Sequence, residues 1–90
     1  MAVWHVELSE SAEDDLAELD KPIRRRVIGA LEWLADNFDS IVPIPLGGVW
    51  KGFFKFRVGD WRLVYEFISA KRTLIVYYID HRGKIYRRHR

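Results

Sequence analysis

Cysteine is absent from this chain of 90 residues, and methionine and proline are scarce, with one and three residues. Without cysteine the protein can form no disulfide, iron–sulfur cluster or thiolate zinc site. This composition suits a reducing compartment, so we expect a cytoplasmic protein. The longest hydrophobic run, Leu74 to Ile79, is far too short to span a membrane, and Glu7 and Glu10 occupy the region where a signal peptide would be apolar. We therefore expect no membrane partner.

Acidic and basic residues are divided between the two halves of the sequence. Residues 1–45 contain four Lys/Arg and ten Asp/Glu, which gives −6, whereas residues 46–90 contain eleven and three, which gives +8; the sum is the overall charge of +2. A basic half of this kind favours a polyanionic partner such as nucleic acid, or an acidic protein segment. A solvated surface with no specific partner is the alternative explanation.

Hydrophobic residues make up 49% of the chain, which is enough for one core and too little for two, so residues 1–90 should form a single domain. Ser9 or Ser11 should cap a first helix, and Asp20 with Pro22 should begin a second. The predicted fold is α+β in the order β-α-α-β-β-β, with both helices on one face of a small, mainly antiparallel sheet. The expected strands cover residues 4–8, 53–58, 61–68 and 73–80, the helices run to about residues 19 and 38, and a loop covers residues 39–48.

The dipeptide Gly59-Asp60 forms the turn of a predicted hairpin. A glycine at the first of two turn positions favours a type I′ or II′ turn, which fixes the register and places Arg57 opposite Arg62. Lys55 should lie on the same face, because side chains alternate along a strand. Like charges in opposite positions destabilise a hairpin, so this pairing favours a bound anion. The alternative is that Glu66 and the turn carboxylate neutralise the cations locally.

The C-terminal segment from Asp80 contains two candidate acid or base groups, His81 and Tyr86. It also contains several basic side chains that can donate hydrogen bonds to a phosphate. Arginine can bind phosphate through two parallel hydrogen bonds, whereas lysine acts as a point charge. This combination suits phosphodiester chemistry with no metal and no cofactor. A metal site is not expected, because the three histidines are scattered and no carboxylate lies at ligand spacing beside them. The donors of this segment are Arg82, Lys84 and Arg87.

Two segments resemble the RelE branch of the RelE/ParE superfamily of bacterial type II toxins: residues 50–65, which contain Phe-Arg-Val-Gly-Asp-Trp-Arg-Leu-Val-Tyr, and residues 79–86, which read Ile-Asp-His-Arg-Gly-Lys-Ile-Tyr. The predicted element order also fits, so the resemblance covers nearly the whole chain. It implies a ribosome-dependent endoribonuclease that cuts mRNA in the A site and is held inactive by a cognate antitoxin encoded in the same operon. In this reaction the 2′-OH attacks the adjacent phosphate and leaves a 2′,3′-cyclic phosphate and a 5′-OH.

The resemblance also implies roles for individual residues. Arg57 and Arg62 would bind the scissile phosphate, and Arg82 would support or protonate the leaving 5′-oxygen. Lys55 or Tyr86 would accept the 2′-OH proton, and we expect neighbouring cations to lower the pKa of either group and make it a better base. The expected catalytic set is therefore Lys55, Arg57, Arg62, Arg82 and Tyr86, and the expected RNA- or ribosome-binding residues are Lys51, Lys84, Arg87 and Arg88.

His81 is a further candidate acid or base, since some relatives use a C-terminal histidine in this way. Regular strand alternation would point His81 away from Arg82. A structural or hydrogen-bonding role is therefore the alternative for His81.

Two other functions fit the same residues. A ParE-like toxin would bind DNA gyrase and block its turnover without cutting RNA, but such toxins generally lack the complete basic set and the terminal tyrosine that this chain has. The third function is an interaction module whose basic face only receives an acidic antitoxin helix. Trp33 lies off the apolar stripe of the second helix, which favours a position at an interface.

Overall fold

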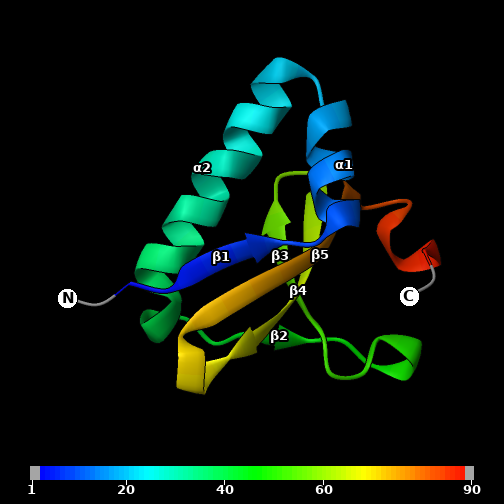
Figure 1. The fold of residues 1–90 in the computed structure, drawn as a ribbon. Coiled ribbons are helices and arrows are strands. Elements are labelled where there is room, and N and C mark those ends of the chain that lie inside the picture. Colours follow the sequence, from blue (N-terminus) through cyan, green and yellow to red (C-terminus); the bar gives the residue numbers. More distant parts are fainter. Residues whose placement is uncertain (1–2, 89–90) are drawn as a thin grey trace.

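Helices and sheet form two layers in the computed structural model, which describes residues 3–88 (Figure 1). The strands are β1 (His5–Leu8), β2 (Ile44–Pro45), β3 (Phe54–Val58), β4 (Trp61–Ile68) and β5 (Thr73–His81), and the α-helices are α1 (Glu10–Glu18) and α2 (Lys21–Asn37). Short 3-10 helices, η1 to η4, cover Phe38–Ser40, Gly48–Trp50, Ser69–Lys71 and Ile85–Arg87. In this described range, no helix combines the length and the apolarity that are needed to cross a membrane.

The strands form one mixed sheet in the order β1-β5-β4-β3-β2. β1 runs parallel to β5, and the other pairs are antiparallel. α1 and α2 lie on the same face of this sheet (Figure 1). The predicted α+β fold, with two helices on a mainly antiparallel sheet, is confirmed. The predicted loop at residues 39–48 needs a correction, because it contains β2, and a strand of two residues leaves no alternation to detect.

Both helices begin where the sequence predicts. The Ser9 hydroxyl caps α1 by accepting a hydrogen bond from the Ala12 N–H at 3.1 Å. α2 follows Asp20 and has Pro22 in its first turn, although the Asp20 side chain makes no capping hydrogen bond. The three- and four-residue spacing of apolar residues in α2 forms the face that packs on the sheet, and its buried residues are Val27, Leu31, Leu34 and Ala35.

Each face of the sheet carries its own hydrophobic core. The main core lies between the sheet and the helices, and Leu63 and Tyr65 are completely buried in it. Val64 alternates with these two residues and therefore points to the other face. There it belongs to a second core with Trp50, Phe53 and Ile85. Two segments thus cover part of the face on which the predicted cations lie. One precedes β3 and carries Trp50 and Phe53, and the other is the C-terminal turn around η4, which carries Ile85.

An irregularity in the pairing of β4 with β5 brings two tyrosines to the same face. Val64 pairs with Tyr78, but the next residue, Tyr65, pairs with Val76, so Tyr77 is an extra residue in β5. Tyr77 and Tyr78 both pack against the second core, whereas Val76 lies in the main core. This β-bulge gives the second face one more aromatic side chain than a regular strand would.

Candidate functional site

The hairpin of β3 and β4 has the predicted turn and register. Gly59 adopts a φ of 61°, a backbone conformation that favours glycine. Arg57 lies directly opposite Arg62, as predicted. A Cβ atom on Gly59 would come within 2.7 Å of the Arg26 guanidinium, so this arginine of α2 also lies against the turn. No local sequence pattern connects Arg26 with the hairpin, because the two are far apart in the chain and on different elements.

The cations of this hairpin form no ion pair among residues 3–88, although Asp80 of β5 lies opposite Arg62 in the register and pairs with Arg88 instead. The ion pairs in this range join other residues, and none of them includes Lys55, Arg57 or Arg62. Asp60 pairs with Arg82 instead, at 3.8 Å between Oδ1 and Nε, and Glu66 accepts a hydrogen bond from the Tyr77 hydroxyl. Local neutralisation by these two carboxylates is therefore not what the structure shows. The like charges remain free to bind an anion.

Backbone carbonyl groups hold the Arg62 guanidinium against the turn. Nη1 donates to the oxygen of Gly59 at 2.7 Å and to the oxygen of Trp61 at 2.9 Å. The other N–H groups of Arg62 have no acceptor within the described part of the chain. An arginine that is fixed at one edge while the rest of its planar fork is free can bind a phosphate through two hydrogen bonds.

Tyr86 lies on η4 and is 39% exposed. It is close enough to the facing Arg57 and Arg62, the arginine pair, for their charges to act on its phenol. Burial raises the pKa of the Tyr86 phenol above its ordinary value of 10.0, while the positive charges of Arg62 and Arg57 act in the opposite direction. From the sequence we expect these cations to lower the pKa of Tyr86 and make it a better base. For Tyr86 that expectation is wrong, because the loss of hydration has the larger effect. Tyr86 is therefore a protonated hydrogen-bond donor at neutral pH.

The turn that carries Tyr86 is anchored on the second face of the sheet. Ile85 is completely buried in the second core. The Trp50 indole N–H donates to the Tyr86 carbonyl oxygen at 3.4 Å. Both contacts fix the backbone on either side of the phenol, so the position of Tyr86 depends on the second core.

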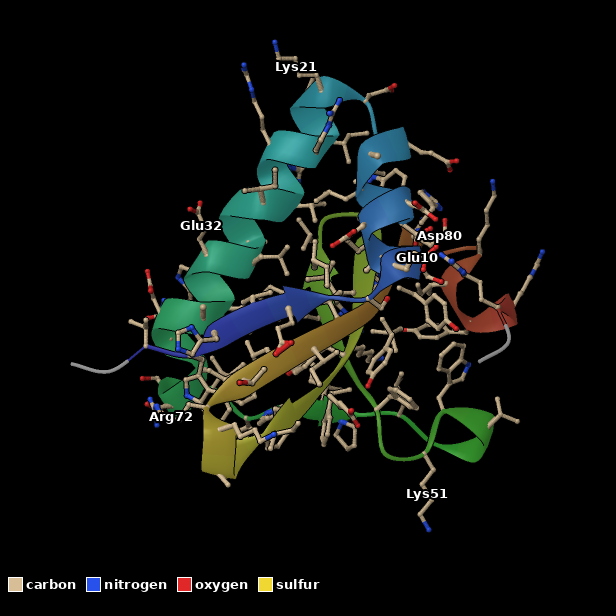
Figure 2. All side chains as sticks on the ribbon, in the orientation of Figure 1. Glu10, Lys21, Glu32, Lys51, Arg72 and Asp80 are labelled. Atoms are coloured by element: carbon tan, nitrogen blue, oxygen red, sulfur yellow. The ribbon has the colours of Figure 1, made fainter. Side chains whose placement is uncertain are left out.

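Arg88 fixes the far end of the same turn. Its Nη1 donates to Asp15 at 2.6 Å and lies 3.5 Å from Asp80. Its guanidinium lies over the Tyr78 ring, 4.4 Å from the centroid. Figure 2 shows Asp80 and the beginning of α1, at Glu10, beside the C-terminal turn. From the sequence we expect Arg88 to contact RNA or the ribosome, but in the structure its guanidinium makes contacts within the protein.

His81 lies on the face of the sheet opposite to the arginine pair. It pairs with Trp61, and the two rings meet edge to face with centroids 5.6 Å apart. Trp61 packs against the main core, and alternation puts the next residue, Arg62, on the other face. The Nδ1 atom of His81 accepts a hydrogen bond from the Gly83 N–H at 3.3 Å. This environment favours the structural alternative for His81.

The remaining candidate residues differ in their surroundings. Lys55 alternates onto the same face and borders a groove between β3 and α2. Arg82 and Arg87 are exposed, and Lys51 projects away from the molecule (Figure 2). Lys84 lines a cavity of about 280 Å³ together with two carboxylates of α1. No three His, Asp or Glu side chains within residues 3–88 are placed to hold a metal ion. The structure thus brings together Arg57, Arg62 and Tyr86, with Lys55 on the same face.

The sequence matches the family described as "ParE toxin of type II toxin-antitoxin system, parDE" over residues 6–86, a range that includes the hairpin and Tyr86. The chain belongs to this family. As a ParE-family protein it is a toxin of a type II toxin–antitoxin system, and the predicted relationship to the RelE/ParE superfamily is confirmed. No curated protein matches the sequence of this ParE-family toxin.

Solved toxin structures share the fold of this ParE-family chain. A chain of the toxin–antitoxin complex RelBE2 from Mycobacterium tuberculosis is 28% identical, with a TM-score of 0.80, over 92% of this chain and 95% of that one. The isolated RelE toxin of E. coli is 21% identical, with a TM-score of 0.68, and the match covers 87% of this chain and 83% of that toxin. The YoeB/ParE toxin from Agrobacterium tumefaciens is 18% identical, with a TM-score of 0.69, and the match covers 86% of this chain and 96% of that toxin. The last two identities are low enough that these similarities show a common fold alone.

Proposed function

We propose that this ParE-family toxin is a ribosome-dependent endoribonuclease that cuts mRNA in the A site, as RelE-type toxins do. The observation that carries the proposal is the facing pair of Arg57 and Arg62, which lies near a protonated Tyr86. Neither arginine has a carboxylate partner within residues 3–88. Two facing cations destabilise the hairpin, and a phosphate bound between them would remove this repulsion.

The proposed reaction requires one bond to form and one to break. The 2′-oxygen attacks the adjacent phosphorus, and the bond from phosphorus to the 5′-oxygen breaks. Arg57 and Arg62 bind the non-bridging oxygens, where negative charge increases in the transition state. Lys55 acts in its neutral amine form and accepts the 2′-OH proton, which makes it an ammonium, and the protonated Tyr86 donates its proton to the leaving 5′-oxygen, which Arg82 supports. The products are a 2′,3′-cyclic phosphate and a 5′-OH, and the proposed chemistry needs no metal and no cofactor.

The partners that follow from this proposal are the ribosome, its mRNA and a cognate antitoxin encoded in the same operon. Exposed cations around the site, Lys51 and Arg87 among them, fit contacts with RNA or the ribosome. Similar solved structures include RelE–RelB complexes from Pyrococcus horikoshii and Methanococcus jannaschii, which supports an antitoxin as partner. An activity on ribosomes would place the toxin in the cytoplasm.

Primer extension on programmed ribosomes tests the proposal. Purified toxin is mixed with ribosomes that carry a defined A-site codon, and the mRNA ends are mapped. We expect a cut within the A-site codon, no cut in naked mRNA, and no cut with Arg57→Ala. Arg25→Ala removes an exposed arginine from α2 and should cut like the unchanged toxin. If the unchanged toxin makes no cut in any lane, the proposal fails.

Inhibition of DNA gyrase is the second candidate function, because the matching family is named for ParE. A gyrase supercoiling assay with the same protein preparation separates the two functions. Loss of supercoiling at toxin concentrations that cut no mRNA would identify a gyrase inhibitor. A toxin that cuts mRNA and leaves supercoiling unchanged would be an endoribonuclease.

A further inference from the structure

A cavity of about 360 Å³ opens on the sheet face that carries the arginine pair, and it has no part in the proposed reaction. Phe53, Glu66, Tyr77 and Tyr78 line it. The β-bulge builds this cavity, because it turns two successive tyrosines to one face. The rings of Phe53 and Tyr77 meet edge to face, with centroids 5.2 Å apart, which fixes the aromatic walls.

Glu66 supplies the charged group in the lining of this cavity. The Tyr77 hydroxyl donates to Oε1 of Glu66 at 2.5 Å and thereby orients the carboxylate. An ionised carboxylate has about four lone-pair positions, so this contact leaves most of its acceptor capacity unused. No ion pair within residues 3–88 includes Glu66. The carboxylate is therefore fixed in place and able to accept hydrogen bonds from a ligand.

The position of Glu66 on β4 relates the cavity to the proposed phosphate site. Glu66 and Arg62 lie on the same face, because they are four residues apart in one strand. At about 3.3 Å per residue, the two positions are about 13 Å apart, a distance that a short single-stranded segment covers. A carboxylate on a face that binds phosphates would repel the RNA backbone. Its position there is explained if it contacts the edge of a base instead of a phosphate.

We infer that this cavity binds a nucleobase of the substrate RNA and that Glu66 selects bases by their N–H donors. This inference rests on the proposed function, since it takes single-stranded RNA to be the substrate. Guanine fits best, because its N1–H and its amino group are adjacent donors. Uracil fits worst, because two carbonyl acceptors flank its single N–H and would face the carboxylate. The aromatic side chains of Phe53, Tyr77 and Tyr78 provide surfaces against which a base can pack.

Mononucleotide binding to the purified full-length chain tests this inference without any need for cleavage. GMP, CMP, AMP and UMP are titrated while the chemical shifts of the protein are followed by NMR. We expect GMP to shift the resonances of Glu66 and Tyr77 and to bind about fivefold or more tightly than UMP. Equal affinities for GMP and UMP, or shifts confined to residues outside the cavity, would overturn the inference.

Two variants test the role of the carboxylate itself. Glu66→Gln keeps the size of the side chain and removes its charge, and it should bring the GMP-to-UMP affinity ratio close to one. Tyr77→Phe keeps the aromatic ring and removes the hydroxyl that orients Glu66, so the ratio should fall by a smaller factor. Glu7→Gln, at an exposed position of β1, is the matched control and should leave the ratio unchanged. The NMR spectra also report whether each variant is folded. A ratio that survives Glu66→Gln in a folded protein contradicts the inference.

The same titrations separate this inference from the proposed function. Arg57→Ala should weaken the binding of all four nucleotides by a similar factor, because a phosphate contact does not distinguish bases. A toxin that prefers GMP through Glu66 but cuts no mRNA on ribosomes would overturn the proposed function and support the base site. If N-acetyl-arginine amide binds in the cavity more tightly than GMP, the cavity accepts a basic side chain of a protein partner, and the inference fails.

Discussion

Arg88 donates to the Asp15 carboxylate at 2.6 Å, and this ion pair joins the C-terminal turn to the first helix. The two side chains are 26% and 15% exposed, so the pair is shielded from water more than an ordinary surface pair is. The same Asp15 oxygen accepts the backbone N–H of Ile79 at 2.9 Å. Through these contacts α1, β5 and the turn that carries Tyr86 are held together.

Arg88→Ala should lower the free energy of unfolding by about 1–3 kcal/mol, because Asp15 and Asp80 would keep their charges in a partly buried place without a cation beside them. Urea denaturation measures this change. Arg87→Ala, at the exposed neighbouring position, should change the free energy by no more than about 0.5 kcal/mol. If the two variants are equally stable, the ion pair contributes no more than a surface pair does.

Tyr86→Phe should slow cleavage by a factor of about 100 or more, because the proposed reaction uses the phenol as a proton donor. Burial raises the pKa of Tyr86 above 10.0, so the phenol stays protonated throughout the neutral range. The ratio of the two cleavage rates should therefore be constant between about pH 6 and pH 9, and single-turnover kinetics on programmed ribosomes measures it. A ratio that changes steeply with pH in this range would mean that Tyr86 ionises there and acts as a base.

Tyr65→Phe should leave the stability at neutral pH unchanged or raise it by up to about 1 kcal/mol. Tyr65 is completely buried, and its hydroxyl has no hydrogen-bond partner among the described residues. Burial raises the pKa of Tyr65 from 10.0 to about 12. The unfolded chain therefore ionises at a lower pH than the folded chain, and the protein loses stability as the pH rises from 10.0 to about 12.

Denaturation of both proteins across this pH range measures the contribution of Tyr65. The variant should lose less stability than the unchanged toxin, because it lacks a buried group that resists ionisation. An identical loss in the two proteins would show that other groups account for the alkaline unfolding.

The features that follow from local rules are those that the sequence predicts well. The Gly59-Asp60 turn fixes the facing of Arg57 and Arg62, because a two-residue hairpin loop leaves one register. The caps and the apolar spacing of the helices likewise depend on residues that are close in the chain. These features are enough to place three of the predicted cations on one face.

The features that depend on distant residues do not follow from the sequence. The bulge at Tyr77 arises from the pairing of two long strands, and no local pattern marks it. In the sequence Arg88 is one more cation of a basic C-terminal segment, and nothing near it indicates an ion pair, because its partner Asp15 lies in the first helix. The direction of the pKa shift of Tyr86 depends on how deeply the turn is buried, and the neighbouring charges alone give the opposite sign.

Arg57→Thr should make the toxin more stable and inactive. The change removes one of two facing cations and introduces a residue that is favourable in strands, so the free energy of unfolding should rise by about 0.2–1 kcal/mol at low salt. The gain should shrink in about 1 M salt, because salt screens the repulsion that the variant relieves. Arg82→Thr removes an arginine that has Asp60 as a partner, and it should give no such gain.

Denaturation at two salt concentrations and primer extension on ribosomes measure both effects. A surface evolved only for solubility would not hold two cations face to face at a cost in stability, so a gain in stability together with a loss of cleavage would link the repulsion to anion binding. A less stable variant that still cuts mRNA would contradict this link.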